Sequence, residues 1–245
     1  MGTRFGGVKQ LAPVGPRGEA ILDVLLARAA AAGFHAAVVV TSATIEHDMR
    51  AHLAAYLASL PVEIVIQPEV PGRERPIGTA HAVLACRDAI DGSFAVVNAD
   101  DLYPFDAFTL LARYLSNESE HGLVAFRVGA TLIGSRPVKR ALLEFDRESA
   151  LVAIRESTVA AGSGGLRGDE WVSMNMWGFS QSIFDAVARA VDDFITAGAP
   201  REILLPDVVA AQVEAGVTVR VLRCDQPCIG ITYAEDVDVV RAALS

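Results

Sequence analysis

Cysteine is scarce in this sequence. The 245 residues include only Cys86, Cys224 and Cys228, an odd and low number that does not fit the disulfide framework of a small secreted domain. Cys224 and Cys228 are close enough in sequence for a metal pair, but no second pair of cysteine or histidine residues lies nearby. We therefore expect no structural zinc. Free thiols are typical of a reducing compartment, so we expect a cytoplasmic protein.

Long apolar runs and an excess of positive charge are absent as well. No run approaches the roughly 20 residues of a membrane-spanning helix, and the first residues lack the apolar core of a signal peptide. We expect no membrane partner. Lys and Arg number 21 against 30 Asp and Glu, which gives a net charge of -9. This balance argues against a nucleic-acid polymer, which binds a basic face, but it permits a small anionic ligand that local cations surround.

Apolar residues, in contrast, are plentiful and alternate between strand-like and helix-like segments. Hydrophobic residues make up 52% of the chain, enough for one large core, and we expect a single domain over residues 1–245. The apolar run 35–41 predicts a strand buried on both faces. The Ala/Leu-rich stretch 19–34 predicts a helix that Gly33 ends.

The same pattern continues along the whole chain and defines a fold class. It predicts a Rossmann-like, doubly wound α/β fold with a mixed, mainly parallel sheet and helices on both faces. After residue 122 short strands follow one another with few helices between them, which predicts a mixed extension of the sheet. We expect further helices at 44–60, 79–90, 105–117, 182–195 and 233–244, and further strands at 62–67, 93–101, 122–128, 140–146, 150–156, 171–179 and 217–224.

The stretch GTRFGGVKQ at residues 2–10 has the composition of a phosphate-binding loop. Its glycines let backbone N–H groups turn toward an anion, Arg4 offers a planar guanidinium, and Lys9 offers a point charge. The stretch matches neither the G-x-x-x-x-G-K-[ST] nor the G-x-G-x-x-G pattern. Taken alone, it leaves open an ordinary polar terminus.

Two acids, Asp100 and Asp101, end the strand expected at 93–101. Open α/β sheets bind ligands at the carboxyl ends of their strands. Mg²⁺ prefers oxygen ligands and needs only one or two carboxylates together with substrate phosphates. The sequence therefore indicates a Mg²⁺ site here, with an aspartate that caps the next helix as the alternative.

Two further stretches carry weaker indications. Gly78 and Thr79 open a helix after a long polar loop, where backbone groups could contact a base edge or a phosphate. A plain cap by Thr79 is the alternative, and we expect His81 in the same helix to be a packed or surface residue. Asn175 lies in an otherwise apolar strand, so it needs either a ligand or a hydrogen-bond partner in the protein.

Taken in order, GTRFGGVKQLAPVGP, GTAHAVLA, FAVVNADD, VSMNMWGF and GITYAEDV resemble the sugar-nucleotide pyrophosphorylases over nearly the whole chain. The similarity is greatest to a poorly characterised bacterial branch of these nucleotidyltransferases. The resemblance implies Mg²⁺-dependent transfer from a nucleoside triphosphate to a sugar 1-phosphate with release of pyrophosphate. It leaves open a non-sugar phosphate acceptor, a nucleotide-binding relative with little turnover, and a homo-oligomer.

The resemblance also implies roles for individual residues. Residues 1–120 would form the nucleotide-binding half and 121–245 the acceptor-binding half. On the nucleotide side, the resemblance implies triphosphate binding by Gly2, Thr3, Arg4 and Lys9, and nucleobase contact by Gln67, Gly78 and Thr79. It implies metal binding by Asp100, with Asp101 in the second shell of the metal, and sugar contact by Glu156 and Asn175. The implied catalytic residues are Arg4, Lys9 and Asp100.

Three departures from the family pattern shape the expectations. No cation follows Glu156, although relatives usually place one there for the sugar phosphate. Gly230 and Thr232 stand where many relatives have a second metal ligand, and we expect Asp236 in the first turn of the last helix. The family's loop follows a buried strand, whereas Met1 already matches a loop residue. We therefore expect the natural protein to carry about ten more residues, one strand plus its turn, and the chain from Met1 to be weaker in folding and activity.

Overall fold

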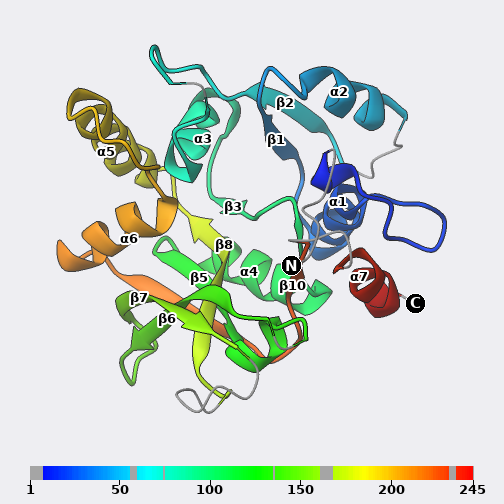
Figure 1. The fold of residues 1–245 in the computed structure, drawn as a ribbon. Helices are drawn as coiled ribbons and strands as arrows, with labels where there is room; N and C mark the ends of the chain where they lie inside the picture. Colours follow the sequence, from blue (N-terminus) through cyan, green and yellow to red (C-terminus); the bar gives the residue numbers. More distant parts are fainter. Residues whose placement is uncertain are drawn as a thin grey trace.

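The computed structural model of this chain describes residues 8–55, 60–73, 75–134, 136–160, 168–231 and 236–244. Helices and strands alternate through its first half (Figure 1). In chain order, the elements of this half are η1 (Lys9–Leu11), α1 (Ile21–Ala32), β1 (Ala37–Thr41), α2 (Glu46–Ala55), β2 (Val62–Ile66), α3 (Thr79–Ala85), η2 (Arg87–Ala89), β3 (Phe94–Val96), β4 (Asp101–Leu102) and α4 (Phe105–Asn117).

The second half contains most of the sheet and three further helices. Its elements are β5 (His121–Arg127), η3 (Val128–Thr131), β6 (Val138–Phe145), β7 (Leu151–Val159), β8 (Trp171–Phe179), α5 (Ile183–Thr196), α6 (Leu205–Glu214), β9 (Val219–Cys224), β10 (Ile229–Gly230) and α7 (Asp236–Leu244). No helix in the described ranges is long and apolar enough to cross a membrane.

β8 is the centre of the main sheet, whose strands run in the order β7-β6-β8-β5-β9, with β3 also paired to β8. Of the pairings between described strands, β1–β2 and β5–β9 are parallel, and those that β8 makes with β3, β5 and β6 are antiparallel. The Rossmann-like mixed α/β fold is thus confirmed, but parallel pairing is less extensive than predicted. The reason is that β8 enters the sheet against the direction of its three neighbours.

Helices cover both faces of β8, as predicted. On one face, Trp177 and Phe179 are fully buried and share a cluster with residues of α3, α5 and α6. On the other face, Met174 and Met176 pack with residues of α1 and α4. Side chains alternate across a strand, so a continuous apolar strand supplies both layers of the core.

A slot of ≈ 680 Å³ separates β1 from β3. Its walls are residues 36–40 and 93–100, and α1, α4 and α3 close it with apolar side chains that include Leu25, Phe108 and Val83. In the described part of the chain, β1 pairs with β2 and β3 pairs with β8, and no ladder joins β1 to β3. Within the described residues, the slot is therefore flanked by two strand edges that no other described strand covers.

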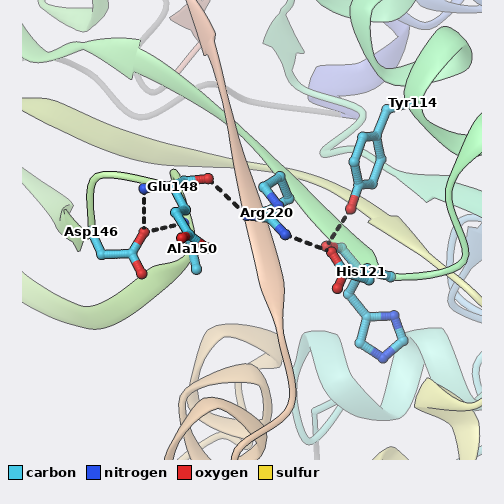
Figure 2. Close-up of polar contacts among 7 residues, drawn as sticks. Tyr114, His121, Asp146, Glu148, Ala150 and Arg220 are labelled. Atoms are coloured by element: carbon cyan, nitrogen blue, oxygen red, sulfur yellow. Dashed lines mark hydrogen bonds and ion pairs between the residues drawn. The ribbon is translucent and has the colours of Figure 1, made fainter.

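Arg220 of β9 ties the turn between β6 and β7 to the start of β5 (Figure 2). Its Nη1 donates to the carbonyl of Glu148 at 2.7 Å, and its Nη2 donates to Glu120 Oε2 at 2.9 Å. Within the turn, Asp146 Oδ1 accepts from the N–H groups of Glu148 and Ala150, each at 2.9 Å. These contacts hold the β6–β7 hairpin in place, and this hairpin carries Glu156.

Candidate functional site

The candidate site lies where β8 changes its neighbour. Near its start, β8 pairs with β6 through Ser173 and Ala141. Near its end, it pairs with β3 through Trp177 and Val96. Between these two contacts β6 and β3 diverge, and a cleft opens in the sheet. Ligands in open α/β proteins bind at such breaks in strand order.

The β8 backbone is irregular at the same place. β5 pairs Leu123 with Trp177 and Ala125 with Ser173, so three residues of β8 face a single residue of β5. The middle residue of these three, Asn175, has φ +57°, a left-handed conformation that asparagine tolerates better than most residues. A bulge of this kind redirects a side chain. Here it brings Asn175 to the cleft, which the alternation of a regular strand does not predict.

The cleft measures ≈ 520 Å³ and brings together residues that are distant in sequence. Asp100 comes from the segment after β3, Glu156 from β7 and Asn175 from β8. The structure therefore joins the predicted metal residue and both predicted acceptor residues in one cavity. Other residues that line it are Asn98, Asp101, Lys139, Arg140, Ser173, Arg201, Asp207 and Ile231.

At one end of the cleft Asp100 forms an ion pair with Lys9, which is not itself among the lining residues. Lys9 Nζ lies 3.7 Å from Asp100 Oδ2, and both side chains are about one-third exposed, at 37% and 32%. The Asp100 carbonyl accepts the N–H of Ile231 at 3.0 Å, which fixes this turn against β10. Gly2, Thr3 and Arg4 lie outside the described residues.

Asp101, the next residue, has contacts different from those of Asp100. Its Oδ2 accepts from Asn98 Nδ2 at 2.8 Å, and a Cβ at Gly230 would lie 2.1 Å from its Oδ1. Desolvation, with a smaller contribution from Asp100, raises the pKa of Asp101 to about 6. With Asp101 in this conformation, a side chain at position 230 would collide with its carboxylate.

The donor groups at this end fit a Mg²⁺ ion that keeps much of its own hydration. Asp100 presents a partly exposed carboxylate, while Asp236 is buried in the first turn of α7, as predicted, and is paired with Arg136. No group of three or more Cys, His, Asp or Glu residues suited to a metal occurs in the described ranges, and Thr232 lies outside them. One carboxylate supplemented by waters and phosphates is a common protein site for Mg²⁺.

The predicted nucleobase residues Gln67 and Gly78 are in contact. Gln67 Nε2 donates to the carbonyl of Gly78 at 3.2 Å and lies 3.2 Å from Nδ1 of His81. His81 is buried, and burial lowers its pKa, so it is a packed histidine as expected. The prediction of a cap by Thr79 is wrong, because Gly78 is the N-cap of α3. The Thr79 hydroxyl instead accepts the N–H of Leu205 at 2.9 Å.

Gly78→Ala is expected to lower the free energy of unfolding by at least about 2 kcal/mol. Gly78 has φ +130°, and its Cβ would lie 2.1 Å from the carbonyl oxygen of Ile203, which cannot move without shifting the backbone before α6. Gly72→Ala is the matched control, since Gly72 has φ +80° with open space around it and should lose only about 1 kcal/mol. Urea titration of both variants measures the difference, and equal losses would contradict the close contact.

Glu156 and Asn175, the residues predicted to contact the acceptor, both line the cleft. Glu156 is exposed and pairs with Lys139 Nζ at 2.9 Å. Asn175 Oδ1 accepts from Trp177 Nε1 at 3.4 Å. Arg155 pairs instead with Glu144 at 3.0 Å and is not among the cleft residues, as strand alternation predicts.

Three cations at the cleft were not found from the sequence. Lys139 and Arg140 belong to β6, and Arg201 precedes α6. The β6–β7 register places Ala141 opposite Glu156, so residues just before Ala141 reach the region where a cation after Glu156 was missing. The short turn at 146–149 between two strand-like segments indicates a hairpin, and from that hairpin the pairing of β6 with β7 could have been predicted.

Comparisons with known proteins show the family of this chain and its fold. A family model described as MobA-like NTP transferase domain matches residues 1–163, and no match is found among the curated proteins. Similar solved structures include the inositol-1-phosphate CTP transferase from T. maritima, with a TM-score of 0.66, 13% identity, and coverage of 93% of this chain and 84% of that chain.

Two further solved structures have the same fold. HddC from Yersinia pseudotuberculosis has a TM-score of 0.63 and 14% identity, and covers 100% of this chain and 96% of its own. The UDP-glucose pyrophosphorylase from Acinetobacter baumanii has a TM-score of 0.64 and 17% identity, and covers 96% of this chain and 85% of its own. At these identities the likeness shows a shared nucleotide-diphospho-sugar transferase-like fold.

Proposed function

Because the chain belongs to the MobA-like NTP transferase domain family and is a nucleotidyltransferase, we propose that it joins a nucleoside triphosphate to a sugar 1-phosphate in a Mg²⁺-dependent reaction that releases pyrophosphate. The observation that carries this proposal is the single cleft that contains Asp100, Glu156 and Asn175. Two similar structures are named for reactions of this class, an inositol-1-phosphate CTP transferase and a UDP-glucose pyrophosphorylase.

In the proposed reaction, an oxygen of the acceptor phosphate attacks the α-phosphorus of the triphosphate in line. A new P–O bond forms, the bond between the α-phosphorus and its bridging oxygen breaks, and pyrophosphate leaves. Neither a nucleophilic side chain nor a covalent intermediate is required. The work of the protein is to position two anions and to offset their charge.

Positive charge at the triphosphate end comes from Lys9 and from Arg4 of the predicted loop, and Gly2 and Thr3 of that loop supply uncharged hydrogen-bond donors. Asp100 would hold Mg²⁺, which supplies charge neutralisation on the phosphate oxygens when bound. The Lys9–Asp100 distance of 3.7 Å is longer than a direct hydrogen bond, so the two groups can separate toward different partners. We assign the nucleobase to Gln67, Gly78 and Thr79, and with it the nucleotide to residues 1–120.

The acceptor half, residues 121–245, supplies hydroxyl contacts and positive charge. Glu156 accepts from sugar hydroxyls, and Asn175 both donates and accepts. Lys139 and Arg201 provide cations for the acceptor phosphate in place of one after Glu156. The Lys139–Glu156 pair is exposed, at 72% and 63%, so it contributes little to stability and can open for a ligand at small cost.

A second candidate is transfer to a non-sugar phosphate, such as a polyol phosphate. The cations at the cleft come from β6 and from the segment before α6, and not from the segment after Glu156. This placement favours an acceptor that differs in shape from a sugar 1-phosphate. The free and buried Cys86, Cys224 and Cys228 support a reducing, cytoplasmic setting for either reaction.

The test is a matrix of nucleoside triphosphates against phosphorylated acceptors, with Mg²⁺ present and pyrophosphate release as the readout. We expect one base and one sugar 1-phosphate to give turnover. Turnover with polyol phosphates alone would favour the second candidate. Nucleotide binding by calorimetry without pyrophosphate from any acceptor would contradict both and indicate a binding protein.

A further inference from the structure

We propose that Tyr103 is a positioning residue that sets the separation between the metal side and the acceptor side of the cleft; this inference rests on the proposed function. Tyr103 follows β4 and is 0% exposed. Its hydroxyl donates to the carbonyl of Met174 at 2.5 Å and accepts the N–H of Asn98 at 3.1 Å, and it also lies 3.4 Å from Asp101 Oδ2. Asn98 follows β3 and Met174 lies in β8, so one hydroxyl joins β8 to the segment after β3.

The hydroxyl stands where strand pairing stops. β3 pairs with β8 only as far as Val96 and Trp177, and β6 pairs with β8 only from Ser173 backward. The Met174 carbonyl falls between these two ladders. A backbone carbonyl away from water needs a donor, and removing that donor would leave its desolvation uncompensated. Tyr103 thus replaces a ladder bond at the position where β6 and β3 separate.

Both backbone partners of the hydroxyl are adjacent to residues with proposed roles. Asn98 also donates its side-chain amide to Asp101 at 2.8 Å, next to Asp100. Met174 precedes Asn175, whose left-handed backbone presents its side chain to the cleft. A shift of the Tyr103 contact would therefore change the Asp100–Asn175 separation. Misplacement of reacting groups by about 1 Å can cost a hundredfold in rate.

The ring of Tyr103 is held independently of its hydroxyl. It packs edge-on to Phe108 with ring centroids 6.3 Å apart, and against Phe126 at 6.2 Å. Arg28 donates to the Tyr103 carbonyl. Burial raises the pKa of Tyr103 well above its usual value, so the hydroxyl keeps its proton. Tyr103→Phe therefore removes the hydroxyl contacts with Met174, Asn98 and Asp101 while the ring keeps its neighbours.

Tyr114→Phe is the matched control (Figure 2). The Tyr114 hydroxyl of α4 donates to the carbonyl of His121 in β5 at 3.2 Å. Tyr114→Phe therefore also loses a hydrogen bond from a tyrosine hydroxyl to a backbone carbonyl of the sheet. Tyr114 does not line the cleft. A purely structural role for Tyr103 predicts the same outcome for both variants, namely a loss of stability with unchanged kinetic constants.

The experiment compares steady-state kinetics of the full chain and both variants, using the triphosphate and acceptor that the wild type accepts. For Tyr103→Phe we expect kcat/KM for the acceptor to fall at least about tenfold, with the KM of the triphosphate within about twofold of wild type. For Tyr114→Phe we expect both constants to stay unchanged. Unchanged acceptor kinetics in Tyr103→Phe, with an active wild type, would overturn the positioning role alone.

A second readout does not depend on turnover. Amide hydrogen exchange at Asn98 should accelerate in Tyr103→Phe, because its N–H loses an acceptor, and should stay slow in Tyr114→Phe. If Asn98 exchange is the same in wild type and Tyr103→Phe, the proposed tie is absent. Inactivity of the wild type toward every substrate pair would contradict the proposed function, and the exchange result would still decide the role of Tyr103.

Discussion

Replacing Asp100 by asparagine is expected to slow pyrophosphate release by roughly 10²- to 10³-fold, the usual loss when one preorganised charge contact of a transition state is removed. Asp100 is the partly exposed carboxylate at the Lys9 end of the cleft. Asparagine keeps the shape but loses the charge that favours Mg²⁺. The effect on stability should be small, since partly exposed ion pairs contribute about 0–1 kcal/mol. Turnover rates at several Mg²⁺ concentrations and a thermal unfolding curve measure both quantities.

Asp106→Asn is the matched control for this prediction. Asp106 lies in the exposed first turn of α4 and does not line the cleft, so its charge should matter only for the helix end, by less than about 1 kcal/mol. Turnover of this variant should equal that of the wild type. If Asp100→Asn releases pyrophosphate as fast as Asp106→Asn, the assignment of the metal to Asp100 is wrong.

Filling the slot between β1 and β3 is expected to produce the largest change in stability. An apolar extended segment of about five residues, joined ahead of residue 1 by a short turn, should raise the unfolding temperature by roughly 10 °C. This shift corresponds to about 3–4 kcal/mol in a domain of this size. The segment would bury apolar side chains against α1, α4 and α3, at about 1.5–3 kcal/mol each before entropy costs. It would also pair with the facing edges of both strands.

An extension of the same length made of glycine and serine separates strand formation from a mere increase in length. This control should leave the unfolding temperature unchanged, because it has no apolar surface to bury. Amide exchange in β1 and β3 should slow with the apolar extension alone. If the two extensions behave alike, the slot does not accept a strand.

Regular elements with a clear apolar pattern could be predicted well from the sequence. β8 has the expected bounds, Trp171–Phe179, because it is apolar on both faces and therefore lies at the centre of the sheet. The helix α6, Leu205–Glu214, was not predicted. Pro206 near its start looks like a helix breaker in sequence, but it is tolerated in the first turn, where the N–H has no helical partner. β3 ends at Val96, earlier than predicted, because β8 bends away at its bulge.

Three residues of the cleft could be singled out from the sequence, but its geometry could not. The ordered motifs pointed to Asp100, Glu156 and Asn175, and the structure places all three in one cleft. The left-handed conformation of Asn175 depends on the change of partner along β8, which is a long-range property that local sequence does not show. The cations of β6 were missed for the same reason, since they reach the cleft through strand register.

The central claim is that this cleft transfers a nucleotidyl group, and the fate of labelled phosphorus tests it most directly. The protein is incubated with Mg²⁺, an accepted phosphorylated acceptor, and a triphosphate labelled either at the α- or at the γ-phosphorus. We expect the α-label to appear in the acceptor product and the γ-label in pyrophosphate. Appearance of the γ-label in the acceptor product, or in inorganic phosphate with the acceptor unchanged, would contradict attack at the α-phosphorus and with it the account of the site.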